Sequence, residues 1–348
     1  MAPRRALHRC PWLASLLAVA LVLTACKRKP ATDGSEALRS ISAESPSPPA
    51  VKATGGKAAP ARSTAPPPAK IWEEFSGERA FAEVKKQFEL GPRPSGSTEL
   101  DKARGLIAET LAQHGWDIER QEFTSQTPRG SMKFVNIIAR FSATTERPAP
   151  ATTQQAIVCS HYDTKRFSTI RFAGANDGAS STGALLELAR VLALDPTLAA
   201  KVELVFFDGE EALVQFSEDD GLYGSREYAR VLRESGRAAQ FKFGILWDMI
   251  GDRELTITLP PDSPQPLTQQ ILAAAEATGV RSHFTYHSQP IWDDHVPLNR
   301  ARIPTIDLID FDYFSWHTAD DTLDKLSPES LRKVGALTLY HLRAVLGK

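Results

Sequence analysis

Cysteine is scarce in this chain of 348 residues, which contains only three. Cys10 and Cys26 lie within the first 26 residues, so Cys159 stands alone in the rest of the chain. A lone cysteine cannot form an intramolecular disulfide, and the fold must therefore depend on a hydrophobic core. Cys159 belongs to the apolar run 156–159, which favours a small buried hydrophobic residue over a nucleophile.

An excess of charge of one sign is also missing. The chain has 41 Lys and Arg residues against 42 Asp and Glu residues, a formal net charge of -1. The two signs are mixed along the sequence, without the basic stripe that tracks a phosphate backbone. We therefore expect no nucleic acid among the partners of this protein.

The apolar run near the N-terminus, residues 13–23, is too short for a comfortable membrane span. It follows Arg4, Arg5 and Arg9 and ends at Leu23-Thr24-Ala25-Cys26, which resembles the lipobox of bacterial lipoproteins. The resemblance implies that residues 1–26 are a lipoprotein signal peptide. It also implies that Cys26 is lipidated and anchors the exported chain to the bacterial cell envelope, on the periplasmic or cell-surface face. An uncleaved anchor or an ordinary signal peptide would also export the chain.

Large apolar side chains are nearly absent from residues 27–70, which consist mainly of Ala, Pro, Ser, Thr and Lys. Such a segment cannot bury enough surface to offset the entropy lost on ordering, so we predict a disordered Ala/Pro/Ser-rich tether. Residues 71–348 remain, and one α/β domain commonly has this length.

Short apolar runs alternate with helical patterns in this domain. Strands are predicted at 118–124, 134–141, 156–160, 202–207, 243–247 and 305–309, and the last four are strongly apolar, as buried strands are. Helical spacing is found at 99–114, 179–194, 225–235, 266–278 and 328–346. Buried strands separated by helices predict an α/β fold of three α/β/α layers with a central mixed, largely parallel sheet.

Polar side chains follow the predicted buried strands. His161 comes after the first strand, the acidic group at 208–211 after the second, Asp248 ends the third, and His317 lies a short loop beyond the fourth. Ligand sites form beyond the carboxyl ends of such strands. Residues more than a hundred positions apart should therefore converge on one edge of the sheet.

The residue types at this edge predict a zinc site, because zinc binds His nitrogen and carboxylate oxygen and keeps one open position when it is catalytic. The candidate ligands are His161, Asp177, Glu211, Asp248 and His317. Each alone has a simpler explanation; Asp177, for example, could cap the helix that follows it. Their joint placement at one sheet edge favours a metal.

Glu210 and Glu211 are adjacent carboxylates on a turn that Gly209 makes flexible. They point in different directions, so one can bind the metal while the other faces the substrate. Burial and the neighbouring charge would raise the pKa of the second carboxyl, which suits a proton shuttle.

Several segments resemble the zinc exopeptidase-like aminopeptidase fold, and within it the animal-type glutaminyl cyclases. The metal-site segments are His161-Tyr162-Asp163, Gly174-Ala175-Asn176-Asp177-Gly178, Phe207-Asp208-Gly209-Glu210-Glu211 and Trp316-His317-Thr318. The segments 123–130, 136–138 and 292–297 favour the cyclases, as does the long insert between the acidic pair and Tyr223-Gly224-Ser225. The resemblance runs from about Gly91 to the C-terminal helix.

The resemblance implies a role for each matching residue. One zinc would be held by Asp177, Glu211 and His317. Glu210 would be the general acid/base, with Asp248 and Asp293 forming a hydrogen-bond network around it, and Trp316 would line the substrate pocket. In the two-zinc peptidases, the positions matching His161 and Asp248 hold a second metal, and the position matching Asp177 bridges the two.

The chain also departs from the animal cyclases. Phe216 stands where they have a pocket Trp, the disulfide near the His161 loop cannot form, and the loop at 310–315 is one residue shorter. These departures concern the substrate-contact surface, in which Phe216 is a candidate binding residue, more than the metal.

The implied activity is that of a zinc-dependent glutaminyl-peptide cyclotransferase, an acyltransferase that converts N-terminal Gln of peptides and proteins to pyroglutamate and releases ammonia. The alternative is a two-zinc aminopeptidase, because all five possible ligands are present. A third hypothesis, a lipoprotein that keeps the fold only for binding, would be marked by loss of Glu210, Glu211 or His317, and none is lost. By analogy we expect a monomer.

Overall fold

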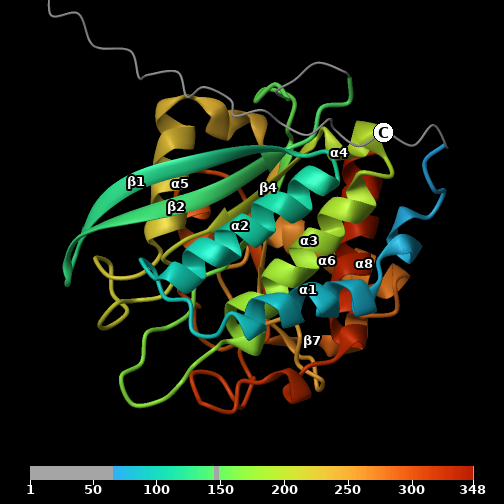
Figure 1. Ribbon diagram of the computed structural model, residues 1–348. Coiled ribbons are helices and arrows are strands. Elements are labelled where there is room, and N and C mark those ends of the chain that lie inside the picture. The colour runs from blue at the N-terminus through green and yellow to red at the C-terminus, as the bar shows by residue number, and fades with distance from the viewer. Residues whose placement is uncertain (1–65, 145–148, 348) are drawn as a thin grey trace, which may run out of the picture. The chain divides into compact units, whose positions relative to one another are not determined.

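The computed structural model describes residues 66–144 and 149–347 (Figure 1). The predicted signal peptide and all but the end of the predicted tether lie outside these residues. The first element is the 3-10 helix η1 (Ile71–Glu74), at the start of the predicted domain.

Among the described residues, eight strands form one sheet in the order β1-β2-β4-β3-β5-β8-β6-β7. They are β1 (Asp117–Thr127), β2 (Gly130–Arg140), β3 (Ala156–His161), β4 (Val202–Phe207), β5 (Phe243–Asp248), β6 (Ile257–Leu259), β7 (Phe284–Tyr286) and β8 (Thr305–Ile309). The central strands β4, β3, β5 and β8 are parallel, whereas β1–β2, β2–β4 and β6–β8 are antiparallel pairs. The predicted mixed, largely parallel sheet is confirmed.

Helices cover both faces of this sheet. They are α1 (Gly77–Glu89), α2 (Thr98–Gln113), α3 (Ser181–Leu192), α4 (Pro196–Ala199), α5 (Tyr223–Glu234), α6 (Gln265–Ala277), α7 (His295–Arg300) and α8 (Pro328–Leu346), with 3-10 turns η3 (Arg237–Gln240), η4 (Arg281–His283) and η5 (Leu323–Lys325). Figure 1 shows α1, α2, α3 and α8 in front of the sheet and α5 behind it.

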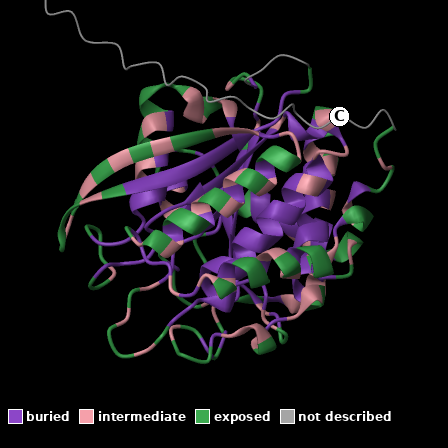
Figure 2. Ribbon diagram, viewed as in Figure 1, coloured by how far each residue is buried: buried purple, intermediate pink, exposed green. Residues whose placement is uncertain are grey.

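Alternate residues of the buried strands pack into different layers, because successive side chains of a strand point to opposite faces. In β3, Val158 belongs to the large core cluster shared with α1, α2, α3 and α8, whereas Ile157 and Cys159 pack with Tyr228 and Leu232 of α5. Cys159 is fully buried, as the sequence predicts. Figure 2 shows the same layering, with α3 and the inner strands buried and the outer faces of α1 and α2 exposed.

Among the α-helices and strands, five were not predicted: α1, α4, α7, β6 and β7. The strands β6 and β7 have three residues each, too few for a period to show. Helix α1 begins after Ser76, whose hydroxyl accepts a hydrogen bond from Arg79 N, and its buried apolar side chains are only Ala80 and Val84. The helix expected from 179 begins at Ser181, because an irregular turn precedes it.

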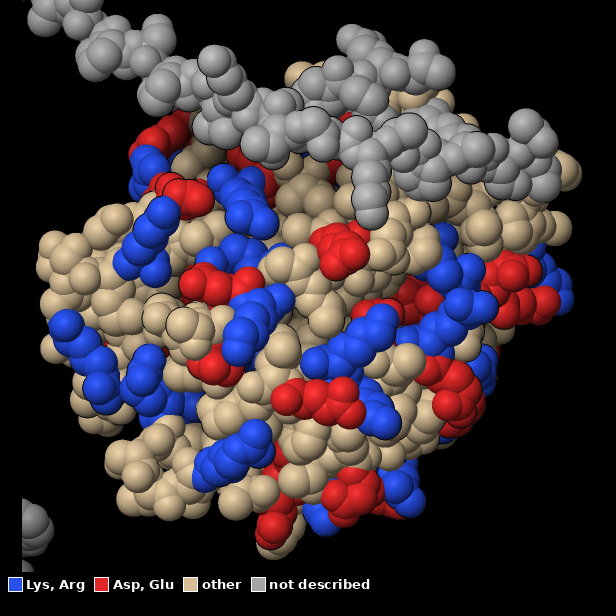
Figure 3. All heavy atoms as spheres, viewed as in Figure 1, with Lys and Arg blue, Asp and Glu red and all other residues tan. Residues whose placement is uncertain are grey.

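In the described part of the chain, no helix is both long and apolar enough to cross a bilayer. On the face that Figure 3 shows, positive and negative side chains are interspersed over the helices. Positive and negative charges are therefore mixed on this part of the surface, as they are along the sequence.

We predict that Gly183→Ala destabilises the domain. A Cβ at Gly183 of α3 would lie 2.6 Å from Val84 Cγ2 and 2.7 Å from the Val84 backbone nitrogen in α1. Backbone cannot rotate away, so the helices would have to separate, which should lower the free energy of unfolding by about 1–3 kcal/mol. Urea unfolding followed by circular dichroism measures this loss.

Gly105→Ala in α2 is the matched control, because nothing lies within 4 Å of the added Cβ. It should be neutral or stabilise the domain by up to about 1 kcal/mol, since Ala favours a helix more than Gly does. Equal stability of the two variants would contradict the close contact of α1 and α3.

Candidate metal and active site

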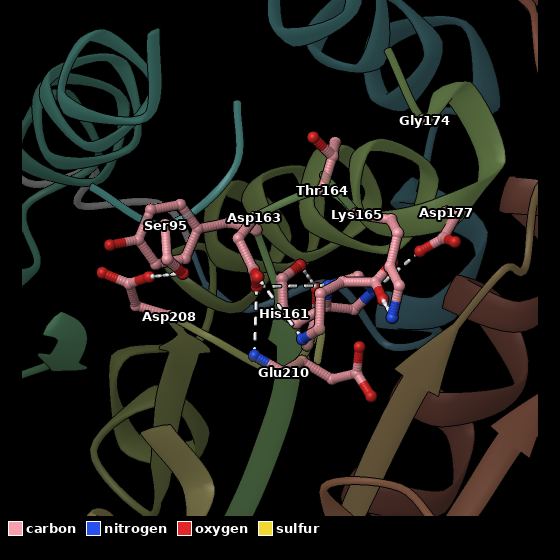
Figure 4. Close-up of polar contacts among 12 residues, drawn as sticks. Ser95, His161, Asp163, Thr164, Lys165, Gly174, Asp177, Asp208 and Glu210 are labelled. Carbon is pink, nitrogen blue, oxygen red and sulfur yellow. Dashed lines mark hydrogen bonds and ion pairs between the residues drawn. The ribbon is translucent and has the colours of Figure 1, made fainter. Parts of the chain in front are cut away.

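The structure brings the five predicted ligands together at the carboxyl edge of the parallel strands. His161 ends β3, Asp248 ends β5, Glu211 follows β4, and His317 lies beyond β8. Asp177 comes from the turn that precedes α3. Because β3 pairs with both β4 and β5, the ends of these strands are neighbours. Figure 4 shows His161, Asp177 and Glu210 arranged around this edge.

The first group of possible ligands is Asp177, Glu211 and His317, whose ligand atoms all lie within 4.8 Å of one another. His317 Nε2 is 3.3 Å from Asp177 Oδ2 and 3.1 Å from Glu211 Oε1. These are the three residues that the sequence assigns to one zinc.

A second group lies on the other side of Asp177. His161 Nε2 is 3.3 Å from Asp177 Oδ1 and 3.2 Å from Asp248 Oδ1. The two groups therefore share Asp177 through different oxygens. This is the arrangement that the sequence predicts for a two-metal enzyme, in which Asp177 would be the bridge.

The donor set of the first group fits a zinc ion. Asp177 Oδ2 is buried and has no hydrogen-bond partner, so it is free to bind a cation. Burial works against ionisation of Asp177, but His161 and His317 outweigh it and hold the pKa of this carboxyl below its usual value. Two carboxylates and one imidazole are ligands that zinc prefers, and they leave a position open for substrate.

The turn that carries Asp177 requires two glycines. Gly174 has φ +54°, and a Cβ there would lie 2.2 Å from the carbonyl oxygen of Asp177. Gly178 has φ +85°, and its Cβ would lie 2.6 Å from the carbonyl oxygen of Asp163. Only glycine fits both the backbone angles and the space. The irregular backbone between them turns the Asp177 side chain toward both imidazoles.

Aromatic rings fix the imidazole of His317. Trp316 stacks on it at 4.3 Å between ring centroids, and Phe167 and Phe172 meet it edge-on at 5.6 and 5.8 Å. His317 itself has φ +55°, which is uncommon for a residue with a side chain. The surrounding contacts therefore hold a strained backbone at the point where the imidazole reaches the carboxylates.

Arg93 supports the site, although no sequence pattern indicated it. Its guanidinium is fully buried and donates hydrogen bonds to the carbonyl oxygens of Tyr162, Ala173 and Gly174. Burial lowers its pKa to about 10, although the charges of Asp177, Asp163 and Asp321 act in the opposite direction. Arg93 thus ties the Asp177 turn to the end of β3 and places a positive charge behind the acidic site.

Two further carboxylates hold the backbone of the ligands. Asp321 accepts hydrogen bonds from the backbone nitrogens of Asn176 and Asp177, at 2.8 and 3.2 Å, and from the hydroxyl of Tyr313. Asp163 accepts from the backbone nitrogens of Glu210 and Glu211, at 3.2 and 3.4 Å. Asp163 lies in a segment that resembles the cyclases, but the role of both carboxylates depends on loop contacts that no sequence pattern shows.

A cavity of about 440 Å³ opens onto this site. Glu210, Glu211, Asp177 and His317 lie in its wall. Its other lining residues include the predicted substrate-contact residues Trp316 and Phe216 and the apolar side chains of Met249, Ile291, Trp292, Ile309 and Phe311. The cavity is therefore acidic at the sheet edge and largely apolar elsewhere.

Carboxyl groups near Glu210 are crowded. Burial, followed by the charge of Glu211, raises the pKa of Glu210 well above its usual value, as the sequence predicts. Asp248 and Asp293 line the same cavity, and burial and the charge of Asp248 raise the pKa of Asp293. Asp208, the other acidic residue after β4, faces away and binds Ser95, Arg104 and the backbone nitrogen of Val135.

Comparison with known proteins shows the family. Residues 136–342 match the model of peptidase family M28. The glutaminyl-peptide cyclotransferase of Drosophila melanogaster is 30% identical over 258 residues, which cover 67% of this chain and 71% of that protein.

Solved structures of glutaminyl cyclases and of an aminopeptidase are also similar to this chain. The chain is 32% identical to the glutaminyl cyclase of an Acidobacteriales bacterium, with a TM-score of 0.71 over 82% of this chain and 98% of the other. It is 26% identical to a leucine aminopeptidase precursor from Bacteroides thetaiotaomicron, with a TM-score of 0.68 over 77% and 97% of the two chains. These likenesses confirm the predicted zinc exopeptidase-like α/β fold.

We predict that Asp321→Ala weakens metal binding without removing a ligand. The backbone nitrogens of Asn176 and Asp177 would lose their acceptor, so the Asp177 carboxylate would be held less firmly. Loss of such an orienting contact typically lowers metal affinity about 10- to 100-fold. Competition with a zinc chelator measures the affinity, and circular dichroism verifies the fold. Asp320→Ala, at the exposed neighbouring position, should retain the parental affinity, and an equal effect of both changes would contradict the assignment.

Proposed function

This chain belongs to peptidase family M28, among relatives of the glutaminyl-peptide cyclotransferases, and we propose that it cyclises the N-terminal Gln of peptides and proteins to pyroglutamate with release of ammonia. The observation that carries the proposal is the position of Glu210. It lies beside the Asp177, Glu211 and His317 group, in the wall of a cavity that is otherwise largely apolar.

One zinc, held by Asp177, Glu211 and His317, fits this site. Bound there, zinc would supply a Lewis acid for the γ-carbonyl oxygen of the substrate Gln. His161 and Asp248 would then remain a hydrogen-bonded pair, since His161 Nε2 is 3.2 Å from Asp248 Oδ1.

Glu210 would move the proton in this reaction. As the α-amine of the substrate attacks its own γ-carbonyl carbon, the Glu210 carboxylate takes a proton from the amine. The bond from that carbon to the nitrogen of the γ-carboxamide then breaks, and Glu210 returns the proton to this nitrogen, which leaves as ammonia. Glu210 is a carboxylate again at the end of the reaction, so no other reactant is needed.

The cavity wall would hold the substrate and exclude water. Because the attack is intramolecular, the protein mainly has to select the rotamer that brings amine and carbonyl together. Trp316 and Phe216 line the cavity and are proposed to make this contact. Asp248 and Asp293 are proposed to form a polar network that holds Glu210 toward the substrate.

A two-zinc aminopeptidase is the second candidate, supported by the group of His161, Asp177 and Asp248. In that enzyme Glu210 would activate a water molecule instead of an amine. The long segment between the acidic pair and α5, which contributes Gln215 and Phe216 to the cavity wall, favours the cyclase.

We also propose that residues 1–26 direct export and that a lipid on Cys26 anchors the chain to the cell envelope, on its periplasmic or cell-surface side. The lipobox-like ending of the apolar run supports this. Residues 27–70 would act as a tether between the lipid and the catalytic domain, 71–348, since their composition is that of a flexible linker. We propose that the enzyme is a monomer.

Product analysis on a Gln-dipeptide tests the proposed activity. Purified protein should release ammonia and the pyroglutamyl peptide in equal amounts, and it should contain one zinc per chain. Free glutamine without ammonia, together with two zinc ions, would identify the aminopeptidase and refute the cyclase.

Glu210→Gln should abolish turnover while zinc stays bound. The substituted amide cannot accept the proton from the amine, so kcat should fall by at least about 100-fold. Ammonia release and the zinc content of the same sample measure the two effects. Glu218→Gln, at an exposed position in the following loop, is the control and should behave like the parent. If zinc is lost together with activity in Glu210→Gln, the division of roles between Glu210 and Glu211 is wrong.

A further inference from the structure

The loop between Glu211 and α5 forms one wall of the cavity. It brings Gln215 and Phe216 to the cavity, yet Val214, Gln215 and Ser217 to Asp219 are exposed. Its buried apolar residues, Ala212, Leu213 and Leu222, lie near its two ends. Apolar packing therefore cannot by itself give the loop one shape, and polar contacts must do so.

Asp220 supplies those contacts from inside the loop. Its carboxylate is buried and accepts four hydrogen bonds. Oδ1 accepts from Leu213 N at 2.8 Å and from the Tyr223 hydroxyl at 3.0 Å. Oδ2 accepts from Val214 N at 2.8 Å and from Gln215 N at 3.0 Å. Three successive backbone amides thus point at one carboxylate, which fixes the chain up to the residue before Phe216.

The ring of Phe216 rests on the far end of the same loop. Gly221 has φ +110°, and a Cβ there would lie 2.8 Å from Phe216 Cε2 and 3.1 Å from the carbonyl oxygen of Glu210. Ser217 and Asp220 are also joined by two backbone hydrogen bonds, of 3.0 and 3.3 Å. The loop therefore closes on itself, with the Phe216 ring against Gly221 and in the wall of the cavity.

The ends of the loop are joined at the acidic pair. Leu222 N donates to the carbonyl oxygen of Glu210, and Tyr223 N donates to that of Gly209, both at 2.8 Å. Asp220 is thus close in the chain to Glu210, but its carboxylate contacts neither the acid/base nor a proposed metal ligand. A change at Asp220 should move Gln215 and Phe216 and leave the metal group in place.

We propose that Asp220 is a positioning residue that holds Gln215 and Phe216 against the substrate and so determines how tightly an N-terminal Gln peptide binds. The inference rests on the cyclase activity proposed above. Burial works against ionisation of Asp220, but the amides of Leu213, Val214 and Gln215 outweigh it and lower the pKa of the carboxyl, as expected of an anchoring carboxylate.

The kinetic test is Asp220→Asn, which keeps the size of the side chain but replaces one acceptor oxygen with an amide group that repels the backbone N–H groups. KM for a Gln-dipeptide should rise about tenfold, whereas kcat should change by less than about threefold and the zinc content should not change. Asp219→Asn is the matched control. Its side chain is exposed, and its carboxylate makes no hydrogen bond in the described part of the chain.

A double-mutant cycle with Phe216→Ala shows whether Asp220 affects substrate binding through Phe216. If it does, Asp220→Asn should raise KM much less in the Phe216→Ala background than in the parent. Additive effects, an unchanged KM in Asp220→Asn, or a loss of zinc with kcat would each overturn the proposal.

Hydrogen exchange gives a readout that does not depend on activity. The amides of Leu213, Val214 and Gln215 should be protected in the substrate-free parent and in Asp219→Asn, and should exchange at least about tenfold faster in Asp220→Asn. Equal exchange in all three proteins would overturn the role of Asp220, even if the enzyme is a cyclase. A parent protein that releases no ammonia would instead refute the proposed function, while the exchange result would still decide whether Asp220 holds the loop.

Discussion

One buried carboxylate lies between two imidazoles, and the rest of the site is arranged around it. Asp177 faces His161 with one oxygen and His317 with the other. A carboxylate in the protein interior is costly unless positive charge or hydrogen bonds compensate it. The structure supplies compensation from several directions: the imidazoles in front, the guanidinium of Arg93 behind, and Asp321 holding the backbone amide. The glycines at 174 and 178 allow the turn that makes these contacts possible.

The Asp177 carboxylate is placed either to bind one metal ion or to bridge two. A metal on the His317 side alone fits an enzyme in which the substrate carries its own nucleophile. Metals on both sides fit an enzyme that must activate water. The choice between these uses would then depend on the cavity, where Trp316 stacks on His317 and the loop held by Asp220 presents Phe216. The resemblance to the animal cyclases predicts that Phe216 replaces a tryptophan at this loop position, so we expect this wall to differ in detail from theirs.

The sequence predicted those parts of the structure that depend on local pattern. Apart from Glu203, the run 202–207 is apolar on both faces, as expected of a central strand, and Glu210 and Glu211 follow its end. Arg93 could not be predicted, because its partners are three carbonyl oxygens that lie 69 to 81 residues away in the chain. Helix α1 was missed although it is amphipathic, because its fully buried positions are Gly77, Ala80, Val84 and Gln87, without the long aliphatic side chains that marked the predicted helices. Asp220 could not be singled out from the sequence, since nothing in the sequence shows that three amides converge on its carboxylate.

The proposed ligands come from the turn before α3 and from the segments that follow β4 and β8, and Asp177 and His317 lie 140 residues apart in the chain. No fragment of the protein brings them together, so a cation would bind the folded chain and have little affinity for the unfolded one. By mass action, a free metal concentration 100 times the dissociation constant would then stabilise the native state by about 2.7 kcal/mol. The supply of zinc to the proposed site would thus govern the survival of this protein against proteolysis as well as its turnover.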